Sequence, residues 1–241
     1  MDCQLRREKD RCYPYRNKPL KYFPVFLKIT ARKCLVVGGG AVGTRKALSL
    51  VACGAIVTVV SPEATDTLKA LAREGDITLK TRPYRPSDMD GMFLVFGATN
   101  TEALNRQINQ DAEQLNTLCN IADRPEVCNF ILPATVKRDD LVIAISTSGK
   151  SPAFAKQLRK QLEQQFGQEY ATFLKLMGGI RSLLLKEKHA PEEHKPIFNR
   201  IIESGIIDLI RDGKKEEINA VLRNILGDGF TFDDLLELDH G

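Results

Sequence analysis

The sequence predicts an α/β protein in which a doubly wound parallel sheet is followed by a β-hairpin and a C-terminal helical domain. Three features of the pattern predict it. Short apolar runs alternate with helical patterns between residues 34 and 121, as expected for the βα units of a parallel sheet. Two β-rich runs joined by a short polar turn come next. After residue 152 the pattern is helical to the end.

The first apolar run, Cys34–Val37, leads directly into a glycine-rich turn and a helix. Gly38, Gly40 and Gly43 have the GxGxxG spacing of the strand, turn and helix that seat a dinucleotide pyrophosphate. We expect Gly38 to form the tight turn, Gly40 to admit the phosphates and Gly43 to let helix pack on strand. The helix N-terminus adds free N–H groups and a positive dipole end. A plain βα turn is the alternative, but the flanking strand and helix favour a Rossmann-type cofactor domain.

The remaining elements of this domain follow from the same alternation. Gly54 ends the first helix, and β-branched residues dominate the run after it. We expect strands at Cys34–Val37, Ala55–Val60, Ile77–Thr81, Met92–Phe96 and Leu118–Ile121, and helices at Val42–Ala52, Ala64–Glu74 and Glu102–Gln114.

The end of the second strand bears on the choice of nicotinamide cofactor. An NAD-binding fold usually carries Asp or Glu there for the ribose hydroxyls, whereas an arginine suits the 2′-phosphate of NADP. This chain has Ser61 and Pro62 instead, with Glu63 near the expected position and no arginine. The sequence therefore favours NAD. The fourth strand runs into a small polar turn with Thr99, at the edge where such sheets bind ligands.

The second half of the chain predicts a hairpin followed by helices. Asn129–Val136 and Leu141–Ser146 form the hairpin, whose uncovered apolar face would suit a second subunit in a homodimer. We expect helices at Ala153–Phe166, Glu169–Glu187, Pro196–Asp212 and Lys214–Leu226, the second of them interrupted or kinked at Gly178-Gly179. The predicted parts are a basic leader (1–21), the cofactor domain (22–127), the hairpin segment (128–152) and the helical domain (153–241).

Composition excludes several classes. With no apolar run of about 18 residues and no signal peptide, we expect a cytoplasmic protein that spans no membrane. A net charge of +4 is too mild to indicate nucleic acid. The six cysteines include no CxxC pair, and we expect buried free thiols. The three histidines are expected at the surface of the helical tail, so no metal site is predicted.

Two further clusters could carry chemistry beside the glycine turn. Asp123 ends the fifth strand, where it is either a catalytic carboxylate or a solvated acid paired with Arg124. The turn Ser146–Pro152 is either an anion site at a helix start or simply a capped helix. Its Gly-Lys-Ser is no P-loop, because Ala144 stands where that motif needs glycine. We expect the three clusters to converge at one cleft, whose surrounding basic residues form a solvated face or a polyanion clamp.

Several segments together resemble the precorrin-2 dehydrogenase family, the dehydrogenase and ferrochelatase part of siroheme synthase. The resemblance covers residues 22–167. It rests on Pro24–Leu27, Val36–Gly43 with Arg45–Ala47, Ala98–Asn100, Asn120–Asp123, Phe130–Ala134 and Ile145–Pro152, which occur in register.

The resemblance implies NAD-dependent oxidation of precorrin-2 to sirohydrochlorin by a homodimer, and some members also insert ferrous iron. It places the catalytic general base on Asp123 and a tetrapyrrole-binding hydroxyl on Thr147, next to Ser148, where many relatives carry glycine. The cofactor residues it implies, with the turn glycines, are Gly38, Gly40, Ala41, Val42, Gly43, Ser61, Pro62, Glu63 and Thr99. The expected substrate-binding residues are Ser146, Thr147, Ser148, Lys150 and Arg124.

Two alternatives stay open. Iron or cobalt insertion leaves no ligand signature in this family, so the sequence does not decide it. A non-catalytic NAD-sensing regulatory module also uses a Rossmann turn, but it would not need the Asn120–Asp123 and Ser146–Pro152 segments. A methyltransferase domain, as in a trifunctional siroheme synthase, is not expected at this length.

Overall fold

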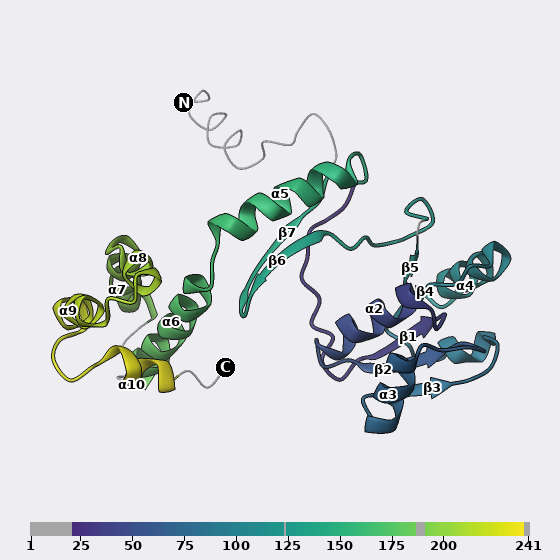
Figure 1. The fold of residues 1–241 in the computed structure, drawn as a ribbon, viewed down its shortest axis with the longest axis horizontal. Helices are drawn as coiled ribbons and strands as arrows, with labels where there is room; N and C mark the ends of the chain where they lie inside the picture. The colour runs from purple at the N-terminus through teal and green to yellow at the C-terminus, as the bar shows by residue number, and fades with distance from the viewer. Residues whose placement is uncertain (1–20, 123, 187–190, 239–241) are drawn as a thin grey trace, which may run out of the picture. The chain divides into compact units, whose positions relative to one another are not determined.

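The structure, a computed structural model, describes residues 21–122, 124–186 and 191–238. The chain divides into two compact units, with their boundary between Leu132 and Pro133 (Figure 1). Nearly all of the predicted basic leader lies outside the described residues. So do the predicted catalytic residue Asp123 and two of the histidines, His189 and His240.

The first unit is the predicted doubly wound parallel sheet. Its strands have the order β3-β2-β1-β4-β5, and every neighbouring pair is parallel. The strands are β1 (Lys33–Val37), β2 (Ile56–Val60), β3 (Ile77–Lys80), β4 (Leu94–Gly97) and β5 (Leu118–Ile121). The helices are α2 (Ala41–Val51), α3 (Asp66–Glu74), α4 (Glu102–Gln114) and the short 3-10 helix η1 (Pro86–Met89).

Both faces of the sheet are covered, and β1 shows how. Its side chains alternate, so that Cys34 and Val36 pack with residues of α2 and α3, while Leu35 and Val37 pack with residues of α4 and η1. All four are buried. A central parallel strand buried on both faces needs this continuous apolar run, which is what the sequence provides.

The segment after β5 differs from the prediction, which began a strand at Asn129. The Asn129 side chain instead accepts the N–H of Cys119 (2.8 Å) and donates to the carbonyl of Thr117 (3.1 Å). Together with one backbone bond from the Asn129 N–H to the Cys119 carbonyl (3.3 Å), these bonds hold the segment at the edge of β5 without a strand. Pro133 has no N–H to donate, and the next strand begins only after it.

The second unit begins with the predicted antiparallel hairpin, β6 (Ala134–Arg138) and β7 (Leu141–Ile145). One face of the hairpin packs on α5 (Pro152–Gln165) through Val136 and Ile145. Arg138 donates to the carbonyl of Glu163 (2.8 Å) and satisfies an acceptor in the last turn of that helix.

The helices of the second unit show two errors in the prediction. The helix α6 (Glu169–Lys186) continues through Gly179 without interruption. Glycine is needed there for packing, because a Cβ would lie 1.8 Å from the carbonyl oxygen of Leu235. The predicted single helix Pro196–Asp212 is two helices, separated at Gly205, which has a φ of +75°. The helices after α6 are α7 (Pro191–Glu203), α8 (Ile206–Arg211), α9 (Lys215–Leu226) and α10 (Phe232–Glu237).

The predictions for single polar residues were partly right. His194, expected at the surface, is buried, because it lies on the face of α7 that carries Ile197 and Ile201 into the core. Cys34 and Cys119 are buried free thiols as expected, whereas Cys53 is exposed. Within the described part of the chain, no helix combines the length and the apolarity needed to cross a membrane.

Candidate functional site

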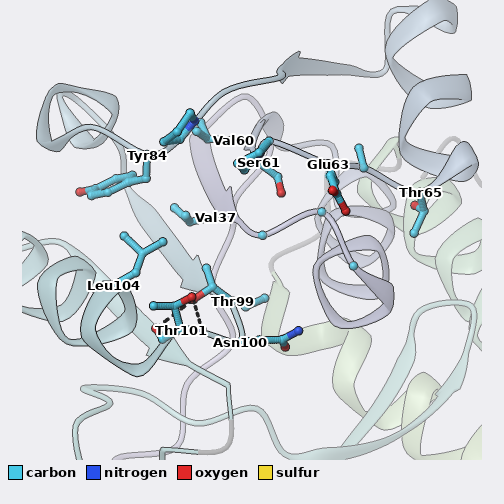
Figure 2. Close-up of a pocket in the computed structure, with 17 residues that line it drawn as sticks. Val37, Val60, Ser61, Glu63, Thr65, Tyr84, Thr99, Asn100, Thr101 and Leu104 are labelled. Carbon is cyan, nitrogen blue, oxygen red and sulfur yellow. Dashed lines mark hydrogen bonds between the residues drawn. The ribbon is translucent and has the colours of Figure 1, made fainter.

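A cleft of about 530 Å³ lies at the carboxyl edge of the sheet in the first unit. It opens where the strand order reverses between β1 and β4, which is the position at which open α/β sheets bind ligands. Figure 2 shows Tyr84, Ser61 and Glu63 along one side of the opening, and Thr99 and Asn100 along the other. The lining residues are Val37–Gly40, Val60–Thr65, Pro83, Tyr84, Ala98–Thr101 and Leu104.

The glycine turn forms the floor of this cleft. Gly38 has a φ of +118°, a conformation that L side chains rarely adopt, and a Cβ there would lie 2.3 Å from the carbonyl oxygen of Ala98. Gly43 does not line the cleft, because it is buried against the carbonyl of Gly38 and the side chain of Val36. Both glycines therefore have the roles that the spacing predicted for them.

The start of α2 is open toward an anion. Its N-cap residue, Gly40, has no side chain to satisfy the first N–H groups, and a Cβ at this position would meet no atom within 4 Å. Unsatisfied N–H groups and free space at the positive end of a helix are what a pyrophosphate needs. Ala41 and Val42 belong to this first turn but do not line the cleft.

A chain of hydroxyls fixes the glycine turn to the next helix. Thr44 donates to the carbonyl of Gly40 (2.9 Å), and the hydroxyls of Thr44 and Thr65 lie 2.8 Å apart. Thr65 is the N-cap of α3, accepting the N–H of Leu68, and its own N–H binds the carbonyl of Gly39 (3.0 Å). The turn is thereby held rigid before any ligand arrives, which reduces the entropic cost of binding.

The three residues after β2 line the cleft, and their contact with a cofactor stays a prediction. Ser61 is buried and its N–H binds the carbonyl of Lys80 (3.1 Å), whereas Pro62 and Glu63 are exposed. Among the described residues that line this cleft, Glu63 is the one carboxylate and none is an arginine or a lysine. The chemistry of the opening therefore suits ribose hydroxyls better than an additional phosphate.

The loop after β3 lines the cleft with residues that the sequence analysis missed. Tyr84 is buried there and donates its hydroxyl to Asp111 of α4 (2.8 Å). Asp88 holds the loop, since it accepts two hydrogen bonds from Arg82 (2.6 and 2.7 Å) and one from Lys80 (3.0 Å). Arg82, and then Lys80, hold the pKa of the Asp88 carboxyl far below its usual range. The position of Tyr84 just beyond a strand end could have signalled this role.

Thr99 is fixed in the turn after β4. Its hydroxyl donates to the side-chain oxygen of Asn105 (2.8 Å), and the Asn105 amide donates back to the Thr99 carbonyl (2.9 Å). Asp123 lies outside the described residues, so the alternative in which it pairs with Arg124 stays a prediction. Arg124 binds Glu102 (2.6 Å) and Glu126 (3.4 Å), and its neighbour Ala122 lines a second, smaller cleft.

The hydroxyl-rich turn belongs to the second unit. Ser151 caps α5 by accepting the N–H of Phe154 (3.2 Å), so the reading as a capped helix start is correct. Thr147 accepts the N–H of Ser151 (3.2 Å) and keeps its own hydroxyl hydrogen as a donor. Ser148 has a φ of +53° and is followed by Gly149 at +82°, so serine adopts the conformation that glycine favours. That Ser146, Thr147, Ser148 and Lys150 meet the cofactor cleft stays a prediction.

Two family models match parts of the chain. A model described as "Putative NAD(P)-binding" matches residues 25–134. A second model, described as "Sirohaem biosynthesis protein central", matches residues 138–165. The chain is similar to siroheme synthases over most of its length. Its first unit is a nicotinamide-dinucleotide-binding domain.

Two of these siroheme synthases match most of the chain. The siroheme synthase of Nitrosococcus oceani is 33% identical over 212 residues, which are 88% of this chain and 45% of that protein. That of Psychrobacter cryohalolentis is 35% identical over 201 residues, or 83% of this chain and 38% of that protein. The chain therefore spans less than half the length of these relatives.

A solved structure supports the fold. The protein named "SirC, precorrin-2 dehydrogenase" matches with a TM-score of 0.70 and 24% identity, over 85% of this chain and 99% of that protein. In the described part of this chain, no group of three or more His, Cys, Asp and Glu side chains is placed to hold a metal ion.

Proposed function

We propose that this chain oxidises precorrin-2 to sirohydrochlorin with NAD in the cytoplasm, a step of siroheme synthesis. The observation that carries the proposal is a preformed dinucleotide cleft at the switch point of the sheet in a chain similar to siroheme synthases. The proposal agrees with the likeness to a protein named as a precorrin-2 dehydrogenase, a match that covers 85% of this chain.

The residues of the cleft fit NAD. The open start of α2 at Gly40 would hold the pyrophosphate, and Glu63 would accept hydrogen bonds from ribose hydroxyls. The absence of a cation from the lining supports NAD over NADP. When bound, NAD supplies the hydride acceptor. Gly38, Ser61, Pro62 and Thr99 shape the walls, and Ala41, Val42 and Gly43 form the helix start behind them.

Oxidation of the macrocycle also releases a proton, for which we assign Asp123 as the general base. A carboxylate at the end of a sheet strand can accept a proton within hydrogen-bond reach of the substrate, and such catalysis contributes about 10²- to 10⁴-fold. We assign Ser146, Thr147, Ser148, Lys150 and Arg124 to the carboxylate-rich substrate. The hydroxyl of Thr147 retains its hydrogen for such a bond.

We further propose a homodimer built on the hairpin. The hairpin face turned away from α5 carries Val142, which is 37% exposed, together with Thr135 and Ala144. Lys137 lies opposite Val142 on the same face, so the apolar part that a second copy would cover consists of Val142 and Ala144. Sedimentation should give a dimer for the wild-type chain and a monomer for Val142→Lys, and a wild-type monomer would contradict the proposal.

The function is tested by adding NAD and precorrin-2 to the purified chain and recording the absorption of NADH and of sirohydrochlorin. Ferrous iron or cobalt added to the same cuvette tests metal insertion, which some family members perform. The second candidate function, an NAD-sensing module, is favoured only if NAD binds and neither chromophore appears.

A further inference from the structure

A second cleft of about 360 Å³ adjoins the dinucleotide cleft in the first unit. The two share Thr99 and Asn100 as a common wall. The other lining residues come from one polar face of α4 and from the loop after β5, on the far side of the switch point. A substrate that exchanges a hydride with a bound dinucleotide must lie next to it, and this cleft is the neighbouring space.

The second cleft is lined by two cations that share one carboxylate. Glu102 accepts a hydrogen bond from Arg106 (3.1 Å) and forms an ion pair with Arg124 (2.6 Å) through the same oxygen, Oε1. Among the described residues that line the cleft, two guanidinium groups and one carboxylate give a net charge of +1, which Glu126 beside the lining offsets in part. Arg124 also contacts Glu126 at 3.4 Å, a longer and weaker pair.

The ion pairs of Glu102 with Arg106 and Arg124 are weak enough for another anion to replace Glu102. The side chains of Arg106, Glu102 and Arg124 are 70%, 61% and 46% exposed. Ion pairs exposed to this degree contribute only about 0–1 kcal/mol each, so an incoming anion displaces Glu102 at little cost. Arg106 and Glu102 lie one turn apart on α4, so Glu102 can move aside while Arg106 stays in the cleft.

We propose that the second cleft is a carboxylate subsite for the tetrapyrrole, in which a substrate carboxylate replaces Glu102 on Arg106 and Arg124. The assignment rests on the proposed function and adds to it a placeholder residue that competes with the substrate. Arg124 and then Arg106 lower the pKa of Glu102, so the placeholder remains ionised at neutral pH. The neutral carboxamide of nicotinamide would gain little from this charge, which favours the substrate as occupant.

The test compares four variants of the full chain. Arg106→Gln and Arg124→Gln remove a cation, Glu102→Gln removes the placeholder, and Arg73→Gln makes the same charge change at the exposed far end of α3. Binding is measured by fluorescence titration with uroporphyrin, a stable tetrapyrrole that is as rich in carboxylates as precorrin-2. The KM for precorrin-2 and the affinity for NADH are measured in parallel.

The proposal predicts opposite shifts. Each arginine variant should weaken uroporphyrin binding and raise the KM about 5- to 10-fold, while Glu102→Gln should improve both about 3-fold, as expected for charge-assisted bonds at an exposed site. NADH affinity and the Arg73→Gln variant should not change. A Glu102→Gln variant that binds uroporphyrin more weakly, or arginine variants that match Arg73→Gln, would overturn the subsite.

The remaining outcomes separate the two proposals. A parallel loss of NADH affinity in the arginine variants would assign the cleft to the cofactor and overturn the subsite. If the wild-type chain oxidises precorrin-2 and the variants have the same KM as the wild type, the subsite alone is rejected. A wild-type chain with no precorrin-2 oxidation would reject the proposed function, and the uroporphyrin titration would then decide the subsite by itself.

Discussion

The carbonyl oxygen of Gly38 lies 1.9 Å from the position that a Cβ of Gly43 would occupy. The last glycine of the turn thus serves the contact between α2 and β1 and does not line the cleft. Gly40, three residues earlier, has the opposite surroundings, with open space where its Cβ would lie. One motif therefore combines a packing glycine with a glycine that leaves room for a ligand.

Alanine at these two positions should give different defects. Gly43→Ala should lower the free energy of unfolding by about 3 kcal/mol, because the new methyl group overlaps the Gly38 carbonyl. Gly40→Ala should change it by less than about 0.5 kcal/mol and still weaken NADH binding at least about 10-fold, since the methyl group fills the space for the pyrophosphate. Urea unfolding and NADH fluorescence measure the two effects, and wild-type NADH affinity in Gly40→Ala would contradict the assignment.

Asp88 should stabilise the first unit in a pH-dependent manner. Asp88→Asn should lower the free energy of unfolding at pH 7 by about 2 kcal/mol, the order expected for lost bonds to a buried carboxylate. The pKa of Asp88 is depressed in the folded chain, so its contribution is complete above the unfolded pKa of about 4 and declines as the pH falls below it. The difference between wild type and Asp88→Asn should therefore shrink by about 1 kcal/mol at pH 3. A difference that is constant from pH 7 to pH 3 would contradict the role of the charge.

The thiols should differ sharply in reactivity. Burial raises the pKa of Cys34 to about 11 and that of Cys119 to about 12, whereas Cys53 is exposed. Iodoacetamide at pH 8 should label Cys53 in the folded chain, and label Cys34 and Cys119 only in urea, as read by peptide mass spectrometry. Rapid labelling of Cys119 in the folded chain would show that β5 is not packed as described.

The sheet was predictable from local pattern because its strands are continuous apolar runs. Residues such as Leu35 and Val36 are buried on opposite faces, and the glycine spacing then determines where α2 begins. The same local rules also located Ser61, Glu63 and Thr99, because residues that follow parallel strands gather at one edge of the sheet.

What the sequence did not predict depends on contacts between distant segments. The low helix propensity of Gly179 predicted a helix break. The residue is glycine because the backbone of α10, more than fifty residues later, packs directly against it. Asn129 has its role only beside β5, and the Asp88 cluster joins residues of a loop that has no periodic pattern. The ion pair of Arg124 with Glu102 is likewise visible only once α4 is placed next to the loop after β5.

Asp123→Asn should abolish turnover without affecting the fold. Asparagine has the same shape but cannot accept the proton, so kcat should fall by at least about 100-fold. Tm and NADH affinity should match those of the wild type. The matched control is Asp90→Asn, an exposed acid of the first unit, which should retain wild-type kcat. Normal turnover in Asp123→Asn would show that another group is the base.

The central claim is tested most directly by the absorption spectrum of the wild-type chain with NAD and precorrin-2. The account predicts that the NADH and sirohydrochlorin bands grow together in equal amounts, and that neither grows without NAD. A spectrum that stays unchanged, although the same preparation binds NADH, would contradict the assignment as a dehydrogenase.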